Sequence, residues 1–450
     1  MKAELVLKDP KAYVNGEVKE CCLAIENGKI AKIGKEPQMP NADAEISLKG
    51  LLVLPGLIDV HVHLRDEGKA YKEDFYSGTA AAAAGGFTTV LDMPNNNPVT
   101  MSAETLKSRM KKAEEKILVN VGFYSEFPKS LHEIDEIIGA GAMAFKLFLS
   151  EQVGGLNIED DGALAEAFEK VTSRTPIAVH AEDKSMIKSV EERLKLEGKN
   201  DVDAFLEAHS ERVEAKAVKR VLKIVEEARA RVHFCHISTK QGLSLVIAAK
   251  KVGLPVTCEV TPHHLLLSAE DFRRFGMLAL TMPPLRSKSH NTALLEGVKN
   301  GWIDVVGSDH APHTLAEKNA DSVWDVKVGI PGLETTLPLL LTEVNAGRLG
   351  LADVVRLMSE NPSRIFGLDG FGNLKEGFRA DLVAVDLKRE VKIDALRFHS
   401  KAKFSPFDGR TAKGMVIKTF VGGKLVMDEG EIVAKPGCGK IIKPQAKAGE

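Results

Sequence analysis

The sequence predicts a (β/α)₈ barrel joined to a small β-sandwich domain that is built from both ends of the chain. Three observations support this prediction. The middle of the 450-residue chain alternates short apolar runs with longer helical patterns, which is typical of a parallel sheet covered by helices. About eight such units follow one another, and eight is the number that closes a TIM barrel. Both ends of the chain instead contain short apolar runs broken by turn residues.

The predicted domain boundaries follow from this change of pattern. We expect residues 52–369 to form the barrel, and residues 1–51 and 370–450 to form the split β-sandwich. Within the barrel region, eight apolar or β-branched runs are candidate strands. These runs are Leu52–His61, Thr88–Met93, Val119–Phe123, Met143–Phe148, Ile177–His180, Val232–His236, Val256–Val260 and Val305–Ser308.

The two terminal segments share one sequence pattern, in which short apolar runs are separated by polar or turn residues. Near the amino terminus, the apolar runs Ala3–Leu7 and Cys21–Ile25 are separated by polar residues, and the second is followed by the turn pair Asn27-Gly28. The same pattern returns near the carboxyl terminus, in the runs Asp381–Val385, Gly414–Val421 and Lys424–Met427 with a turn at Gly422-Gly423. Two β-rich ends around a different middle indicate one domain made by both termini.

The charge balance indicates a small-molecule substrate. Lys and Arg number 61 against 63 Asp and Glu, which leaves a formal net charge of -2. Such a chain has no global field that would attract nucleic acid or an anionic membrane. A homo-oligomer is compatible with this composition, which leaves the oligomeric state open.

The cysteines and the amino terminus indicate a reducing compartment. The five cysteines form no CxxC pair and no regular framework, so we interpret them as free thiols. The amino-terminal residues lack the apolar core of a signal peptide, and no apolar run is long enough to span a bilayer. We therefore expect a cytoplasmic protein.

Residues able to bind a metal follow the candidate strands at the end where a barrel places its chemistry. His61 and His63 alternate on the first strand, so both side chains face the barrel mouth. Histidine nitrogen and carboxylate oxygen are the expected ligands of zinc. Across the barrel the candidate ligands are His61, His63, Lys146, His180, His236 and Asp309.

Each histidine alone has a simpler interpretation, because a single histidine at a strand end is more often a hydrogen-bonded structural residue. Four histidines and Asp309, spread over several strands but all at the catalytic end, are difficult to explain by packing alone. Seven of the remaining histidines are interpreted as structural or as supporting the ligands: His132, His209, His233, His263, His264, His290 and His399.

Lys146 is the most diagnostic of these residues. A protonated lysine beside two divalent cations is strongly disfavoured. Its side chain must therefore point away, as a rim lysine does, or lose its charge. Carbamylation of the amine would produce a carboxylate able to bridge two metals.

At these residues the sequence resembles the cyclic amidohydrolases, and the resemblance covers nearly the whole chain. The motifs that carry it are Asp59–Asp66, Ala84–Pro98, Phe145–Phe148, Val179–Asp183, His236–Lys240, Val260–His264, Pro283–Arg286, Ser308–His313 and Gly332–Thr335. The resemblance implies a metal-binding barrel with a split β-sandwich and two Zn²⁺ ions held by the six residues above. It also implies that Lys146 is an N6-carboxylysine bridge and that Asp309 is a proton shuttle.

Within this family the chain resembles the dihydroorotase subfamily. The pattern implies that Arg65, Asn95 and His313 hold the carboxylate of the substrate, which His63 also contacts, and the planar guanidinium suits this task. Two positions depart from the subfamily pattern. Met282 stands where an asparagine commonly precedes Pro283, and Val328 precedes Gly329 in the segment expected to contact the substrate ring through its backbone.

The subfamily resemblance implies reversible cyclisation of N-carbamoyl-L-aspartate to (S)-dihydroorotate in de novo pyrimidine biosynthesis. Allantoinase and dihydropyrimidinase or hydantoinase are the nearest alternatives, but their carboxylate-free rings would leave the charge of Arg65 unpaired. A mononuclear deaminase would have no use for Lys146. A non-catalytic scaffold would have lost ligands, whereas this chain retains the full set.

Overall fold

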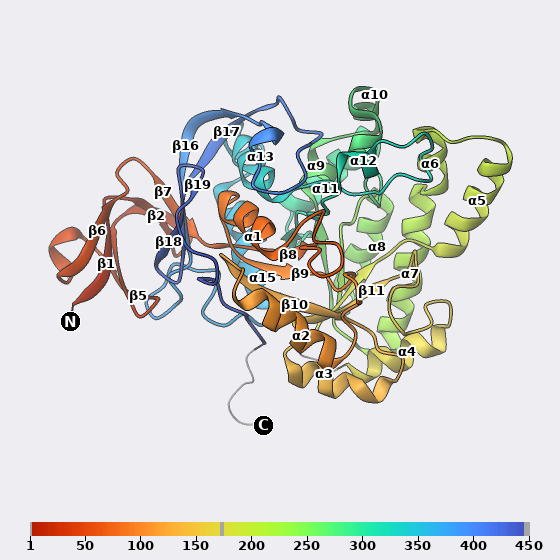
Figure 1. The fold of residues 1–450 in the computed structure, drawn as a ribbon, viewed down its shortest axis with the longest axis horizontal. Coiled ribbons are helices and arrows are strands. Elements are labelled where there is room, and N and C mark those ends of the chain that lie inside the picture. The colour runs from red at the N-terminus through yellow and green to blue at the C-terminus, as the bar shows by residue number, and fades with distance from the viewer. Residues whose placement is uncertain (1, 172–174, 445–450) are drawn as a thin grey trace.

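The computed structural model describes residues 2–171 and 175–444. It contains a barrel with helices around it and, at one end, a region of packed β-sheets (Figure 1). Strands from the first and last parts of the chain lie together in this second region, at the left of the view. The predicted fold class is therefore confirmed: an eight-stranded parallel barrel accompanies a β-sandwich made by both termini.

The barrel strands follow one another in chain order. Within the described residues they form one sheet of eight parallel strands in the order β15-β14-β13-β12-β11-β10-β9-β8. The bounds are β8 Leu57–Val62, β9 Phe87–Asp92, β10 Asn120–Glu126, β11 Ala144–Phe148, β12 Ile177–His180, β13 Val232–Phe234, β14 Val256–Val260 and β15 Val305–Val306. Each of these strands is entirely buried except at one position of β14, as expected for a sheet covered on both faces.

The barrel closes between its first and last strands by a few contacts. Val62 and His310 form an isolated parallel bridge, and the backbone N–H of His63 donates to the carbonyl of His310 at 2.9 Å. On the inner side, the buried carboxylate of Asp59 accepts from the backbone N–H of Ser308 at 3.2 Å. The seam therefore joins the two segments that carry His61, His63 and Asp309.

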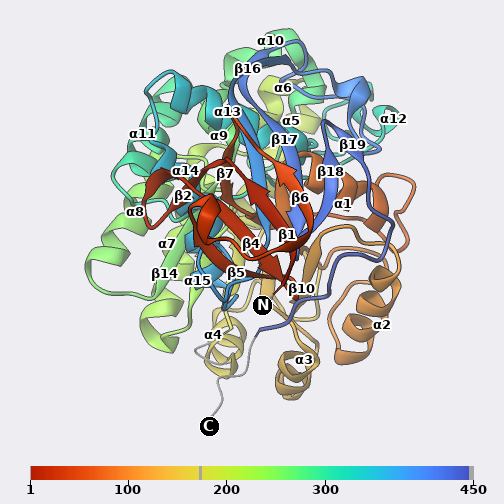
Figure 2. The ribbon, with the colours of Figure 1, turned by 90° about the vertical axis from the view of Figure 1, so that its left-hand side faces the viewer.

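Helices fill the connections between successive barrel strands and surround the sheet, as Figure 2 shows for α2, α3, α4, α7, α8 and α11. Their ends are formed by local caps: Asp74 accepts from the N–H of Ser77 at the start of α1, and Gly141 ends α3 at a φ of 107°. The bounds are α1 Phe75–Ala84, α2 Ala103–Glu114, α3 Ile134–Ala140, α4 Asp161–Lys170, α5 Lys184–Leu196, α6 Val202–Ala208, α7 Glu211–Ala228, α8 Lys240–Lys251, α9 Pro262–Leu266, α10 Phe272–Phe275, α11 Lys288–Lys299, α12 Leu315–Lys318, α13 Leu333–Asn345, α14 Leu351–Val355 and α15 Asn361–Ile365.

The second region consists of two sheets. One has the order β5-β4-β1-β6, and the other has the order β19-β18-β17-β16-β7-β2-β3. A shared apolar core, which includes Leu23, Val53, Leu382 and Phe420, fills the space between them. The bounds are β1 Ala3–Lys8, β2 Lys11–Val14, β3 Glu17–Glu20, β4 Cys22–Glu26, β5 Lys29–Gly34, β6 Ala42–Ser47, β7 Leu52–Pro55, β16 Leu382–Lys392, β17 Thr411–Val421, β18 Lys424–Asp428 and β19 Glu431–Ile432.

The single strand predicted over Leu52–His61 is wrong. The chain breaks at Gly56: β7 pairs with β16 and β2 in the sandwich, whereas β8 begins the barrel. A side chain at position 56 would lie 2.2 Å from the hydroxyl oxygen of Thr88 and 2.9 Å from the backbone of Asp381. Only glycine fits where the chain passes from one domain to the other.

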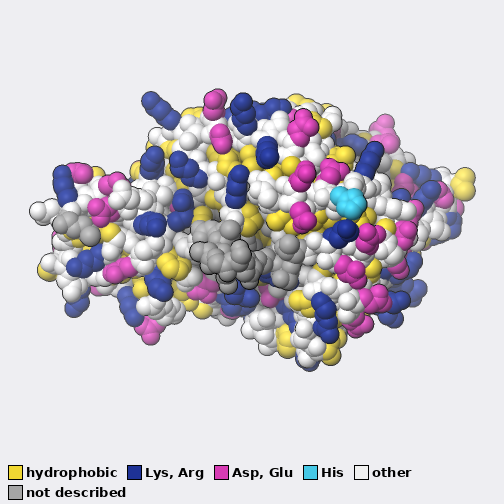
Figure 3. Space-filling model, turned by 90° about the horizontal axis from the view of Figure 1, so that it is seen from below, with side chains coloured by type: hydrophobic (Ala, Val, Ile, Leu, Met, Phe, Trp, Pro, Cys, Tyr) yellow, Lys and Arg dark blue, Asp and Glu magenta, His cyan; other side chains and the backbone are white. Residues whose placement is uncertain are grey.

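The surface carries charges of both signs. Figure 3 shows Lys and Arg side chains interspersed with Asp and Glu on the face seen from below. All five cysteines are free thiols. Among the described residues, no helix combines the length and the apolarity that crossing a membrane requires.

Candidate active site at the carboxyl end of the barrel

A cavity of about 520 Å³ opens at the carboxyl ends of the barrel strands. Its walls contain most of the residues that the sequence analysis selected. Those that line it are His61, His63, Arg65, Asn95, His180, His236, Met282, Asp309, His313, Val328 and Gly329. Lys146 is absent from this wall.

His61, His63 and Asp309 form a compact group on one side of the cavity. The Nε2 atoms of His61 and His63 lie 3.4 and 3.3 Å from the same Asp309 oxygen, Oδ1. One potential ligand atom from each of the three residues lies within 4.8 Å of the others, so the group could hold a metal ion. The alternation of side chains along β8 explains why both histidines face this group.

His180 and His236 complete the histidine side of the cavity. The Nδ1 atom of His180 lies 3.0 Å from Nε2 of His236, and the rings of His61 and His236 are 5.2 Å apart. The Nδ1 atom of His236 is buried without a hydrogen-bond partner. A buried ring nitrogen without a hydrogen-bond partner is expected where a histidine binds a metal ion.

Lys146 lies on β11 and is fully buried. Its Nζ donates to the sulfur of Cys235 at 2.9 Å and lies 4.8 Å from the centre of the Phe148 ring. Among the described residues it has no acidic partner, and an unpaired ammonium is costly to bury. The alternative of a solvent-facing rim lysine is therefore wrong, whereas loss of its charge by carbamylation fits the environment.

Two buried glutamates stand behind the histidines. Glu259 bonds Nδ1 of His61 and lies 3.3 Å from His233, whereas Glu182 accepts from His180 at 2.9 Å and from His209 at 3.0 Å. Burial alone would raise the pKa of each glutamate, but the adjacent histidines hold it well below its ordinary value. Both carboxylates are therefore ionised and orient the rings that face the cavity.

Burial dominates the titration of the residues inside the cavity. It lowers the pKa of His61, His63 and His236, so these imidazoles are neutral and can act as ligands. It also raises the pKa of Asp309, against the opposing influence of His61 and Lys146.

The other side of the cavity is made of hydrogen-bond donors. The buried Arg65 guanidinium lies 3.2 Å from Nε2 of His313, and its Nε has no partner. The amide oxygen of Asn95 lies 2.8 Å from Nδ1 of His63. Gly329 has a φ of 132° and donates its N–H to the carbonyl of Leu280 at 2.9 Å, so the 328–329 segment is fixed against the wall.

Three residues of the site have backbone conformations that L-residues seldom adopt. Arg65, His236 and Asp309 have φ values of 61°, 32° and 46°. Each costs on the order of 1 kcal/mol or more, and such residues concentrate at functional sites. The sequence gives no indication of this strain.

Sequence reasoning missed several residues that shape the site. Glu182 stands two residues after His180, and Glu259 stands inside a buried strand, where a carboxylate is unexpected. The charged Glu259 in an otherwise apolar strand was the signal that could have identified this residue from the sequence. Cys235, Lys72 and Glu317 carried no comparable signal, because their roles depend on contacts between distant segments.

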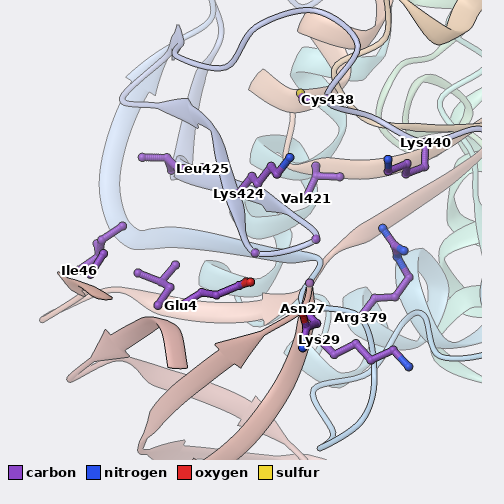
Figure 4. Close-up of a pocket in the computed structure, with 15 residues that line it drawn as sticks. Glu4, Asn27, Lys29, Ile46, Arg379, Val421, Lys424, Leu425, Cys438 and Lys440 are labelled. Carbon is purple, nitrogen blue, oxygen red and sulfur yellow. The ribbon is translucent and has the colours of Figure 1, made fainter. Parts of the chain in front are cut away.

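A second hollow, of about 630 Å³, lies between the sandwich and the closing segment of the chain. Figure 4 shows Lys29, Arg379 and Lys424 around it. Arg379 is already bonded to Asp381 at 2.9 Å, and no histidine lines the hollow. The clustered histidines lie instead in the cavity at the barrel mouth.

The match to a family model defines the class of protein. Residues 52–426 match the model of the amidohydrolase family, and the chain belongs to this family. It is therefore a hydrolase whose metal-dependent chemistry is carried by a TIM barrel.

Relatives with a known name show which kinds of amidohydrolase the chain is similar to. The chain is 37% identical to a dihydroorotase of Methanosarcina acetivorans, across 99% of this chain and 97% of that protein. It is 39% identical to a dihydroorotase of Methanothermobacter thermautotrophicus, across 93% of each. Among solved structures, the L-hydantoinase from Arthrobacter aurescens superposes with a TM-score of 0.94 at 32% identity, across 98% of this chain and all of that one.

Proposed function

We propose that this amidohydrolase is a dihydroorotase, which converts N-carbamoyl-L-aspartate and (S)-dihydroorotate into each other in pyrimidine biosynthesis. The relatives named dihydroorotase support this reaction over the hydantoinase alternative. The observation that carries the proposal is Arg65, which is buried in the cavity wall and has no acidic partner among the described residues. A buried guanidinium without a carboxylate needs an anionic ligand, and dihydroorotate has a carboxylate where hydantoin has none.

We further propose that His61, His63, His180, His236 and Asp309 hold two zinc ions, with Lys146 as an N6-carboxylysine bridge between them. The clustered ligand atoms, the orphaned Nδ1 of His236 and the unpaired burial of Lys146 support this arrangement. Two zinc ions would supply Lewis-acid chemistry, because they polarise a carbonyl and lower the pKa of a bound water.

In this proposal Asp309 transfers the proton. Ring opening adds water to the amide carbonyl and breaks the bond between that carbon and the ring nitrogen. The Asp309 carboxylate, beside His61 and His63, would accept the proton of the attacking water and donate it to the departing nitrogen. Ring closure uses the same residues in reverse.

The donors on the opposite side would hold the substrate. Arg65, His313 and Asn95 would bind its carboxylate, and the backbone of Val328 and Gly329 would contact its ring. Met282 lines the cavity with a thioether, which accepts hydrogen bonds weakly and donates none. The contact made by the usual asparagine would therefore be lost or be made by the backbone.

Arg65→Met tests the proposed substrate directly. We expect kcat/KM for dihydroorotate and for carbamoyl-aspartate to fall by about two orders of magnitude or more, because a buried charge pair is lost. Any slow turnover of dihydrouracil or hydantoin should fall far less, since these rings have no carboxylate. Zinc content should stay at the wild-type level.

Lys327→Met is the matched control, because it removes an exposed cation from the cavity rim. It should leave the ratio between the two substrate types unchanged. Equal losses for both substrate types in Arg65→Met, or wild-type protein that turns over hydantoin and not dihydroorotate, would refute the proposed function in favour of the hydantoinase alternative.

A further inference from the structure

The His313 ring lies between two cationic side chains. The guanidinium of Arg65 is 3.2 Å from its Nε2, and the ammonium of Lys72 is 3.1 Å from its Nδ1. All three side chains are buried. Arginine and lysine can only donate, so each cation offers an N–H group to the imidazole nitrogen that it faces.

A neutral imidazole cannot accept from both. It has one N–H and one nitrogen with a free lone pair, so it accepts a single hydrogen bond in its plane. Burial and the charges of Arg65 and Lys72 lower the pKa of His313 well below its ordinary value, and the ring is neutral. One of the two contacts therefore places two donors opposite each other.

The anchoring of the two cations decides which contact is the hydrogen bond. Lys72 is held by Glu317, whose carboxylate lies 2.7 Å from Nζ and also accepts from the Tyr71 hydroxyl at 3.0 Å. Glu317 is itself fixed in the first turn of α12, where it accepts from the N–H of Thr314 at 3.0 Å. Arg65 has no such anchor, and its Nε is unpaired.

Glu317 does not satisfy His313 directly, because its nearest oxygen is 3.7 Å from Nδ1. The fixed ammonium of Lys72 is therefore the group that determines whether Nδ1 of His313 carries the ring proton. When Nδ1 accepts from Lys72, the ring proton must be on Nε2, on the side that faces Arg65.

We propose that Lys72 is a positioning residue that fixes His313 in its Nε2–H tautomer, so that His313 and Arg65 present their N–H groups jointly to the substrate carboxylate. This inference rests on the proposed function for the identity of the anion. A substrate carboxylate that binds between these two donors would accept a hydrogen bond from each of them. The fixed tautomer also excludes a ligand that would need an acceptor at this position.

The first test is a double-mutant cycle. We expect Lys72→Met to raise KM for dihydroorotate about tenfold while kcat changes less than threefold, and to affect dihydrouracil at least fivefold less. Lys72→Arg retains a donor and should restore most of the affinity. In a His313→Gln background, Lys72→Met should add almost no further loss, because a glutamine amide has no tautomer to fix.

The second test measures the tautomer of His313 directly. In protein labelled with ¹⁵N-histidine, the His313 signal, assigned by its loss in His313→Gln, should show an unprotonated Nδ1 and a protonated Nε2. Lys72→Met should convert it to a mixture of tautomers. Lys327→Met, which removes an exposed cation from the same rim, should change neither the signal nor KM.

The inference is overturned if Lys72→Met leaves the His313 tautomer unchanged, or if its effect is as large in the His313→Gln background as in wild type. These outcomes are separate from failure of the proposed function. If wild-type protein does not turn over dihydroorotate, the proposed substrate is wrong, and the ¹⁵N signals of wild type and Lys72→Met still decide whether Lys72 fixes the tautomer.

Discussion

The two sides of the cavity are built in opposite ways. On the histidine side, His61 and His180 each have a buried, ionised glutamate behind them. On the donor side, the His313 ring contacts Arg65 through Nε2 and Lys72 through Nδ1. Within the described part of the chain, no carboxylate touches Arg65. The histidine side thus contains its negative charges, whereas on the donor side the carboxylate of Glu317 pairs with Lys72 and leaves the charge of Arg65 unpaired. A ligand must bring the negative charge that pairs with Arg65, which indicates an anionic substrate.

The strongest test of the histidine side is Lys146→Ala. If Lys146 carries the bridging carboxylate, the variant should lose zinc and activity together, because the remaining ligands lack their shared negative charge. Metal analysis and dihydroorotate turnover on one preparation measure both. A short carboxylic acid in the buffer should restore part of the activity by occupying the vacated space. Full zinc content and full turnover in the alanine variant would require a different bridge.

Glu259→Gln examines whether the carboxylate behind His61 supports the histidine side. The amide keeps the shape of the side chain but removes the charge that orients His61 and His233. We expect metal affinity or kcat/KM to fall 10- to 100-fold, as is typical when such a supporting carboxylate is lost. Glu343→Gln is the matched control, since Glu343 is buried but pairs with Arg348 away from the cavity. Equal behaviour of the two variants would contradict the role of Glu259.

The last prediction concerns Lys318, which supports the donor side of the cavity. This buried lysine donates to the carbonyls of Leu280 and Gly329 at 3.0 and 3.1 Å, and burial lowers its pKa to about 7. In the unfolded chain its pKa is near 10.5, so above pH 7 the unfolded state binds more protons and stability rises with pH.

Lys318→Met removes this dependence on pH. The stability of wild type relative to the variant should therefore increase by about 2 kcal/mol between pH 7 and pH 9, with the full charging penalty present below pH 7. Unfolding curves in urea at several pH values measure it. Lys327→Met, which removes an exposed lysine close to Gly329 in the sequence, is the control variant. A pH-independent difference for Lys318→Met would show that Lys318 stays charged when buried.

The sequence predicted the histidine side better than the donor side for a physical reason. Strands have a regular alternation, so the positions of His61 and His63 at the end of a buried run predict where both side chains point. Arg65 and His313 lie on irregular segments, and Arg65 has a left-handed backbone that no periodicity indicates. Their common function was inferred from resemblance, whereas the contact with Lys72 required coordinates.

The same contrast applies to the fold. Seven of the eight predicted runs correspond to one barrel strand each, because each is a short, self-contained strand. The run over Leu52–His61 looked like one strand, since an unbroken apolar pattern does not show a change of sheet at Gly56. The glutamates at 182 and 259 were visible in the sequence, but only the structure shows which histidine each one holds.

The change of domain at Gly56 affects the order in which the strands of the sandwich can pair. β7 lies between β2 and β16 in the sandwich, and β16 begins only at Leu382. During synthesis on a ribosome, β7 can therefore pair at first only with β2. Its second partner, β16, is made only after almost the whole barrel has been synthesised. Pairings so distant in sequence form late, because the intervening loop must first be closed. β7, which comes directly before the strand that carries His61, is thus among the last strands to complete its pairing.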